Sequence, residues 1–71
     1  MKKYIVASRQ KLKVGDCVEI LGDSWYAGEW GVIRYIDEED DEYHVAIANG
    51  KETPIFSKRE LAKMKYTPDG V

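Results

Sequence analysis

Trp25, Tyr26 and Trp30 lie within the stretch GDSWYAGEWG, residues 22–31, whose glycines are typical of turns. Large aromatic side chains anchor protein interfaces at a small loss of conformational entropy, and their ring faces attract cations or stack on bases. The stretch therefore indicates a binding chemistry. Because adjacent residues of an extended loop cannot both point inward, we predict that Trp25 and Tyr26 project as partner anchors. Trp30, at the start of a strand, is predicted to pack on the folded domain.

A fourth aromatic residue extends this hypothesis. An aromatic cage for a methylated lysine needs about three rings around the cation. Tyr43, in a later alternating segment, is the candidate for a ring beside Trp25 and Tyr26. The favoured function is a non-enzymatic module that binds a protein partner through this loop, with contacts from Trp25, Tyr26, Trp30 and Tyr43.

Residues for catalysis or metal binding are few. His44 is the only histidine and Cys17 the only cysteine, so a Cys–His dyad is conceivable, but a surface histidine and a half-exposed thiol are the simpler interpretation. These two residues lack a recognised metal-ligand spacing, and the acidic run at residues 37–42 lacks the glycine and spacing of a calcium loop. Residues 22–28 lack the lysine of a phosphate-binding loop. We expect no enzyme activity, metal site, cofactor or small-molecule substrate.

Charge is divided along the chain. Residues 1–13 carry five basic and no acidic side chains, residues 14–53 carry eleven acidic and two basic ones, and residues 54–71 carry four basic and two acidic ones. Phosphate affinity comes mainly from lysine and arginine, and chain ends usually lie close together in small domains. The alternative function is therefore RNA or DNA binding by the basic segments, with contacts from Lys11, Lys13, Lys58, Arg59, Lys63 and Lys65.

Two further observations bear on these alternatives. The aromatic stretch at residues 22–31 contains acidic but no basic residues, which weighs against stacking on nucleic-acid bases. The acidic run DEEDDE at residues 37–42 suggests a weaker alternative, in which an acidic hairpin imitates phosphate spacing and occupies a nucleic-acid-binding protein.

Length and composition indicate one small domain. The chain has 71 residues and is 44% hydrophobic, which allows a compact fold with little core to spare. It has no long apolar run and no signal-peptide pattern, so we expect a cytoplasmic protein that does not enter a membrane. A single cysteine excludes an internal disulfide and fits a reducing compartment.

Three segments have the pattern of short strands. They are residues 16–21 (DCVEIL), residues 31–37 (GVIRYID) and residues 42–48 (EYHVAIA). Ile33 and Ile36 are three positions apart, so a bend or bulge between them is needed to bring both side chains inward. Together with the segments that follow, they predict a core of Val18, Ile20, Ile33, Ile36, Val45, Ile47, Phe56, Leu61 and Met64.

The connections between strands also carry signals. Six like charges would be costly in a core strand, so residues 37–42 are predicted to form an exposed turn. Asn49-Gly50 is a strong hairpin signal, and Gly31 is expected where one strand passes close to another. Gly22, Gly28 and Gly50 are expected to supply positive φ angles or tight turns.

The last part of the chain predicts a strand, a helical turn and a final strand. Residues 53–57 (TPIFS) form the return strand, with proline at its start or on an edge. Ser57 begins a single helical turn, with Glu60 at the capping-box position, and residues 62–66 (AKMKY) form the last strand. The prediction is a small all-β fold, a five-stranded SH3-like barrel with one helical turn before the last strand. Its parts are residues 1–13 as a basic arm or additional strand, residues 14–66 as the barrel and residues 67–71 as a tail.

The stretch VGDCVEI…GEWGVIRYID resembles the KOW motif, which occurs in bacterial NusG-type transcription factors and in some ribosomal proteins. The matching positions are Gly15, Asp16, Val18, Ile20, Gly28, Gly31, Val32, Ile33 and Ile36. Residues 49–65 (NGKETPIFSKRELAKMK) look like the end of the NusG domain. The resemblance implies an SH3-like barrel that binds protein or nucleic acid through its loops. Polymerase binding is not carried over, because it belongs to a separate domain for which this chain has no room.

Overall fold

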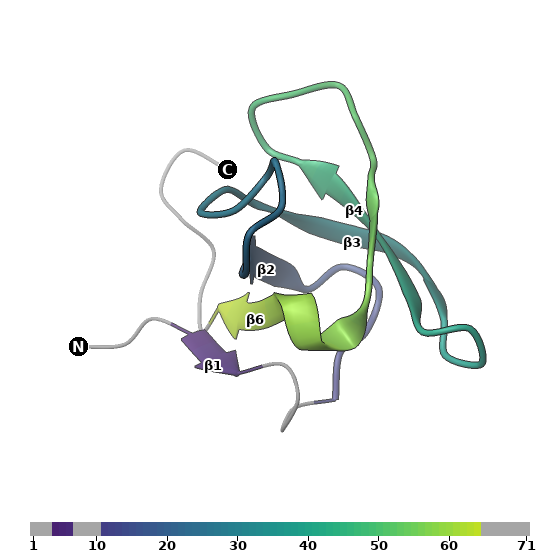
Figure 1. The fold of residues 1–71 in the computed structure, drawn as a ribbon. Helices are drawn as coiled ribbons and strands as arrows, with labels where there is room; N and C mark the ends of the chain where they lie inside the picture. Colours follow the sequence, from purple (N-terminus) through teal and green to yellow (C-terminus); the bar gives the residue numbers. More distant parts are fainter. Residues whose placement is uncertain (1–3, 7–10, 65–71) are drawn as a thin grey trace.

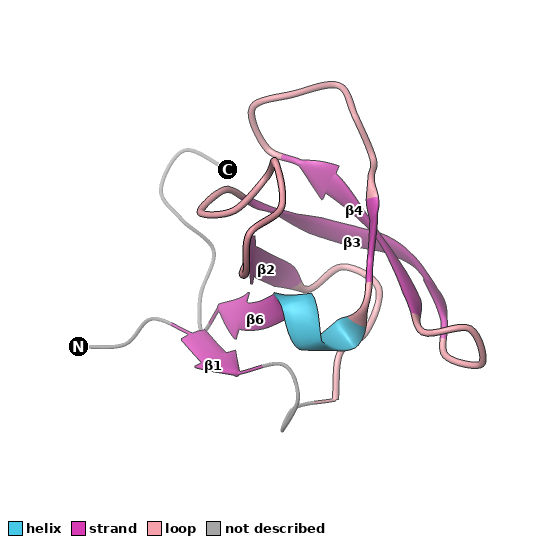
Figure 2. Ribbon diagram, viewed as in Figure 1, coloured by secondary structure: helices cyan, strands magenta, loops and turns pink. Residues whose placement is uncertain are grey.

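The computed structural model describes residues 4–6 and 11–64, which form one antiparallel sheet with a single helical turn (Figures 1 and 2). The elements are β1 (Tyr4–Val6), β2 (Cys17–Ile20), β3 (Trp30–Asp37), β4 (Glu42–Ile47), β5 (Ile55–Phe56), the 3₁₀ turn η2 (Lys58–Glu60) and β6 (Leu61–Met64). The sheet order is β1-β6-β2-β3-β4-β5. The predicted all-β fold, with a helical turn directly before the last strand, is confirmed.

The five predicted strands are β2 to β6. Strand β6 pairs with β2, so the last of these strands lies beside the first, and β2, β3, β4 and β5 follow as consecutive antiparallel neighbours. Strand β1 pairs with the other edge of β6. It falls within residues 1–13, the segment expected to form an arm or an additional strand.

The core lies on one face of the curved sheet. Side chains alternate between buried and partly exposed along β2 and β4, as the period of a strand requires. Seven of the nine predicted core residues belong to the buried cluster, which also contains Leu12 and Tyr43. Ile36 is only partly buried but packs against this cluster, whereas Met64 is half-buried and lies outside it. The buried cluster consists of Leu12, Val18, Ile20, Ile33, Tyr43, Val45, Ile47, Phe56 and Leu61.

Strand β3 has two features that the sequence predicted. Its register with β4 shifts between Ile33 and Tyr35, and this irregularity allows Ile33 and Ile36 to face the core although they are three positions apart. Gly31 lies so close to β4 that a Cβ atom there would collide with the carbonyl oxygen of Ala46 and lie 2.7 Å from Val45 Cγ1. A side chain at residue 31 would therefore force the two strands apart.

Asn49-Gly50 lies in the connection between the antiparallel strands β4 and β5, as predicted, but without the positive φ angles that favour an Asn-Gly turn. Neither residue is among the described positions with positive φ. Instead, Gly50 N–H donates to Ile47 O at 3.2 Å, and Ile47 N–H donates to Glu52 O at 3.1 Å, so the connection from β4 to β5 is wider. In η2, the Glu60 carboxylate accepts the Ser57 backbone N–H at 2.8 Å, as the predicted capping pair requires.

Strand β3 connects two regions that lie at its opposite ends. The first loop, residues 21–29, connects β2 to β3 and lies at the same end of the sheet as the second loop, residues 48–54, which connects β4 to β5 (Figure 1). The acidic turn, residues 37–42, lies at the tip of the β3–β4 hairpin, at the other end of β3 (Figure 1). Among the described residues, no helix has the length and apolar character needed to cross a membrane.

Candidate interaction site at the first loop

The backbone of the first loop is closed by hydrogen bonds. Ile20 N–H donates to Glu29 O at 2.8 Å, and Gly28 N–H donates to Ile20 O at 2.9 Å, so the β2–β3 hairpin continues into the loop. Gly22 and Gly28 have φ angles of 85° and 88°, which glycine adopts without the penalty of a Cβ atom. The predicted conformational role of both glycines is confirmed, and the loop has a defined shape.

Trp25 is displayed at the tip of this loop. It lies in a turn closed by the hydrogen bond from Ala27 N–H to Ser24 O, at 3.0 Å. The side chain is 89% exposed, more than any other large hydrophobic side chain of the described residues. Its predicted projection into solvent is confirmed. An indole fixed on an ordered turn loses little additional freedom when it is covered by a partner.

Tyr26 points the other way, so the prediction that it projects with Trp25 is wrong. Its ring packs edge-on against Phe56, with centroids 6.0 Å apart, and contacts the core cluster. Its hydroxyl donates a 2.6 Å hydrogen bond to Glu52 Oε1. This bond, partial desolvation and the negative charges of Glu52 and Glu29 raise the pKa of Tyr26 above 10.0. Tyr26 therefore ties the first loop to the core and to the second loop.

Exposed carboxylates lie in the first loop and in the second loop, which the Tyr26 hydroxyl joins. Asp23 and Glu29 lie in the first loop on either side of Trp25, and Glu52 is brought to the first loop by the Tyr26 hydroxyl. Lys51 is the one basic residue in the two loops. The region around Trp25 therefore carries an excess of negative charge.

Tyr43 and Trp30 do not join Trp25. Tyr43 is 4% exposed and belongs to the core cluster, because the alternation of β4 points it inward with Val45 and Ile47. The predicted cage of Trp25, Tyr26 and Tyr43 is therefore not assembled. Trp30 is half-buried on the sheet face opposite to Gly31 and Ile33, so it is neither a core residue nor a fully exposed one.

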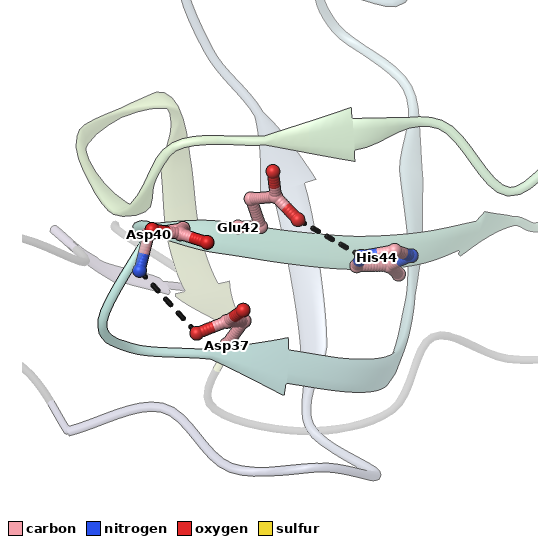
Figure 3. Close-up of polar contacts among 4 residues, drawn as sticks. All are labelled: Asp37, Asp40, Glu42 and His44. Atoms are coloured by element: carbon pink, nitrogen blue, oxygen red, sulfur yellow. Dashed lines mark hydrogen bonds and ion pairs between the residues drawn. The ribbon is translucent and has the colours of Figure 1, made fainter.

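The acidic turn is a structured turn in which half of the side chains have local partners. Asp37 Oδ1 accepts the Asp40 backbone N–H at 3.3 Å, and Glu42 Oε1 lies 3.7 Å from His44 Nε2 (Figure 3). Asp41 has a φ angle of 55°, and its Oδ1 accepts the Lys58 backbone N–H at 2.9 Å, which connects the turn to η2. The Glu38, Glu39 and Asp40 side chains are exposed.

One of the predicted nucleic-acid contacts, Lys63, has its ammonium group near a carboxylate. Asp16 Oδ2 lies 3.6 Å from Lys63 Nζ, and the same oxygen accepts the backbone N–H of Lys13 at 3.0 Å. Lys58 and Arg59 lie in η2, beside the acidic turn. Lys11 is exposed, and Lys65 lies outside the described residues.

Cross-strand register creates an exposed row that sequence reasoning missed. Tyr35 pairs with His44, and His44 pairs with Ile55, so the three side chains share the outer sheet face. Tyr35 and His44 form an edge-on ring contact with centroids 4.9 Å apart, and Tyr35 is 56% exposed. Only knowledge of the bulge in β3 places Tyr35 on this face. Among the described residues, no group of three or more His, Cys, Asp or Glu side chains could hold a metal ion.

Comparisons with known proteins give no relative. No family model matches the chain, and neither the curated proteins nor the solved structures give a match. The chemistry of the site must therefore be inferred from its own geometry and charge.

Proposed function

We propose that this chain is a non-enzymatic interaction module, an SH3-like barrel resembling KOW domains, that binds a protein partner through its first loop. The observation that carries the proposal is the 89% exposure of Trp25 on a turn with a hydrogen-bonded backbone. Such an aromatic side chain offers a large contact area at low entropic cost, which is typical of interface anchors. Tyr26 acts as the positioning residue that holds the loop against Phe56 and Glu52.

Charge favours protein over nucleic acid as the partner of this loop. Asp23 and Glu29 lie in the first loop, where phosphate groups would be repelled. The lysine ammonium of Lys63, one of the candidate phosphate contacts, already faces the Asp16 carboxylate. RNA or DNA binding by the basic segments is therefore kept as an outcome of the test.

The test compares two exposed aromatic residues in different regions. Wild-type protein, Trp25→Ala and Tyr35→Ala are immobilised, and proteins retained from a lysate of the source organism are identified by quantitative mass spectrometry. We expect a set of proteins that wild type and Tyr35→Ala retain and that Trp25→Ala loses. Wild type and the two variants should have similar melting temperatures, because substitutions of exposed side chains change stability by only about 0.5 kcal/mol.

Each other result contradicts the proposal. Equal retention by wild type and Trp25→Ala would mean that the first loop is not the site. Loss with Tyr35→Ala alone would move the site to the outer face of β3, β4 and β5. Loss of all retained proteins after nuclease treatment would identify nucleic acid as the bridging ligand and would favour the alternative function.

A further inference from the structure

We infer that the segment recognised at the first loop is cationic, an arginine- or lysine-containing stretch of the partner protein that places a side-chain cation against Trp25. The inference rests on the proposed function and adds the chemistry of the ligand to it. It follows from the charges around one exposed ring.

The loops at this end of the sheet carry acidic side chains. Asp23 and Glu29 are exposed on the same loop as Trp25, and the Tyr26 hydroxyl brings Glu52 to that loop through a 2.6 Å hydrogen bond. The hydrogen bond to Glu52 and the negative charges of Glu52 and Glu29 also raise the pKa of Tyr26, the residue that follows Trp25. The only opposing charge in the two loops is Lys51.

Apolar, anionic and cationic ligands would interact differently with this surface. A purely apolar segment that covered Trp25 would have to remove water from nearby carboxylates without replacing it, which is costly. A phosphate or carboxylate ligand would meet like charges. A guanidinium or ammonium group is attracted both by the negative face of the indole and by the carboxylates, so it satisfies both features of the surface.

The first loop has a defined backbone shape before a ligand binds. The loop backbone is closed by the hydrogen bonds of Ile20 with Glu29 and of Gly28 with Ile20. Tyr26 is fixed between Phe56 and Glu52. The loop backbone that carries Trp25, and the Glu52 carboxylate bound to Tyr26, are therefore held in place before a ligand arrives, which reduces the entropic cost of binding.

The experiment measures the binding of labelled probes by fluorescence anisotropy. The probe is a peptide of alternating arginine and glycine; its controls are the same peptide with citrulline in place of arginine, and single-stranded oligothymidylate. The variants are Trp25→Ala and the double change Asp23→Asn with Glu29→Gln. The matched control variant is Glu38→Gln with Glu39→Gln, which removes the same charge from the acidic turn.

We expect wild type to bind the arginine peptide more tightly than either control probe. Trp25→Ala should weaken this binding about 10-fold, as the loss of a cation–ring contact requires. Neutralising Asp23 and Glu29 should weaken it about fivefold, and added salt should reduce the difference. Neutralising Glu38 and Glu39 should change it less than about twofold, since these charges lie at the other end of β3.

Opposite results separate the two proposals. Equal binding of the citrulline peptide, tighter binding of oligothymidylate, or an equal effect of the two double variants would overturn the inference. If the arginine peptide does not bind while Trp25-dependent capture of proteins persists, the inference fails and the proposed function stands. If capture is also independent of Trp25, both are overturned.

Discussion

The first loop and the acidic turn lie at the two ends of β3, and each contains or borders a tyrosine that contacts the core. In the first loop, Trp25 is directed into solvent, and backbone hydrogen bonds and Tyr26 maintain the loop shape. In the acidic turn the side chains themselves maintain the shape, because Asp37 and Asp41 accept backbone N–H groups. The most exposed side chain of the first loop therefore faces solvent, whereas two side chains of the acidic turn stabilise the turn itself.

This difference shows how to distinguish a binding surface from a structural turn. A side chain that already accepts a backbone N–H, such as Asp41, is held in one position by that bond, although its second oxygen can still accept a hydrogen bond. Most of the surface of Trp25 is exposed to water, so the side chain is available to a partner. In the acidic run, Asp37 and Asp41 hold backbone N–H groups, whereas Glu38, Glu39 and Asp40 stay exposed.

The largest expected effect comes from the core that supports both regions. Ile33 is fully buried at the centre of β3, and Ile33→Ala should cost about 2–5 kcal/mol of unfolding free energy, through lost burial and a cavity. A domain of this size has little more in reserve, so much of the population should unfold. Urea unfolding monitored by circular dichroism measures this. Val14→Ala, at an exposed position, should stay within about 0.5 kcal/mol of wild type, and an equally small loss for Ile33→Ala would contradict the assigned core.

The sequence predicted the fold and Trp25 better than it predicted the surroundings of Trp25. Period-two alternation identified Val45 and Ile47 as core residues, because burial of one sheet face leaves a local signature. The same alternation puts Tyr43 on the face of Val45 and Ile47, but its aromatic ring made it the candidate for the third ring of a cage. The direction of Tyr26 depended on Phe56 and Glu52, which are distant in sequence and meet it only through the sheet. Loop side chains are fixed by such long-range contacts, which no local pattern reports.

An intermediate effect is expected at Asp41. Its hydrogen bond and backbone conformation, and not its charge, should stabilise the turn. Asp41→Ala should cost about 1–2 kcal/mol, because it removes the acceptor of the Lys58 N–H and places alanine at a φ of 55°. Asp41→Asn keeps an acceptor oxygen and tolerates this backbone, so it should remain within about 0.5 kcal/mol of wild type. Asp41→Gly removes only the hydrogen bond and should fall between them.

These three Asp41 variants can be compared by urea unfolding in one buffer. Equal destabilisation by asparagine and alanine would mean that the carboxylate charge, and not the turn geometry, stabilises this region. Asp41 would then act through its charge, and the contrast in which side-chain acceptors hold the acidic turn would be lost.

The smallest expected effect is a dependence of the free energy of unfolding on pH, which comes from Tyr43 next to the acidic turn. Burial, and then the negative charges of Glu38 and Asp41, raise the pKa of Tyr43 above 10.0 in the folded chain. As pH rises above about 10, the unfolded chain loses this proton first, so ionisation favours unfolding and the free energy of unfolding falls. Tyr43→Phe cannot ionise and keeps the ring in the core. The stability of wild type should therefore decline more steeply than that of Tyr43→Phe between about pH 8 and about pH 11, as measured by urea unfolding at each pH. Parallel declines would mean that Tyr43 ionises equally in the folded and unfolded chains. The acidic turn would then not lie over a protected phenol, and the difference between the two ends of β3 would rest on Trp25 alone.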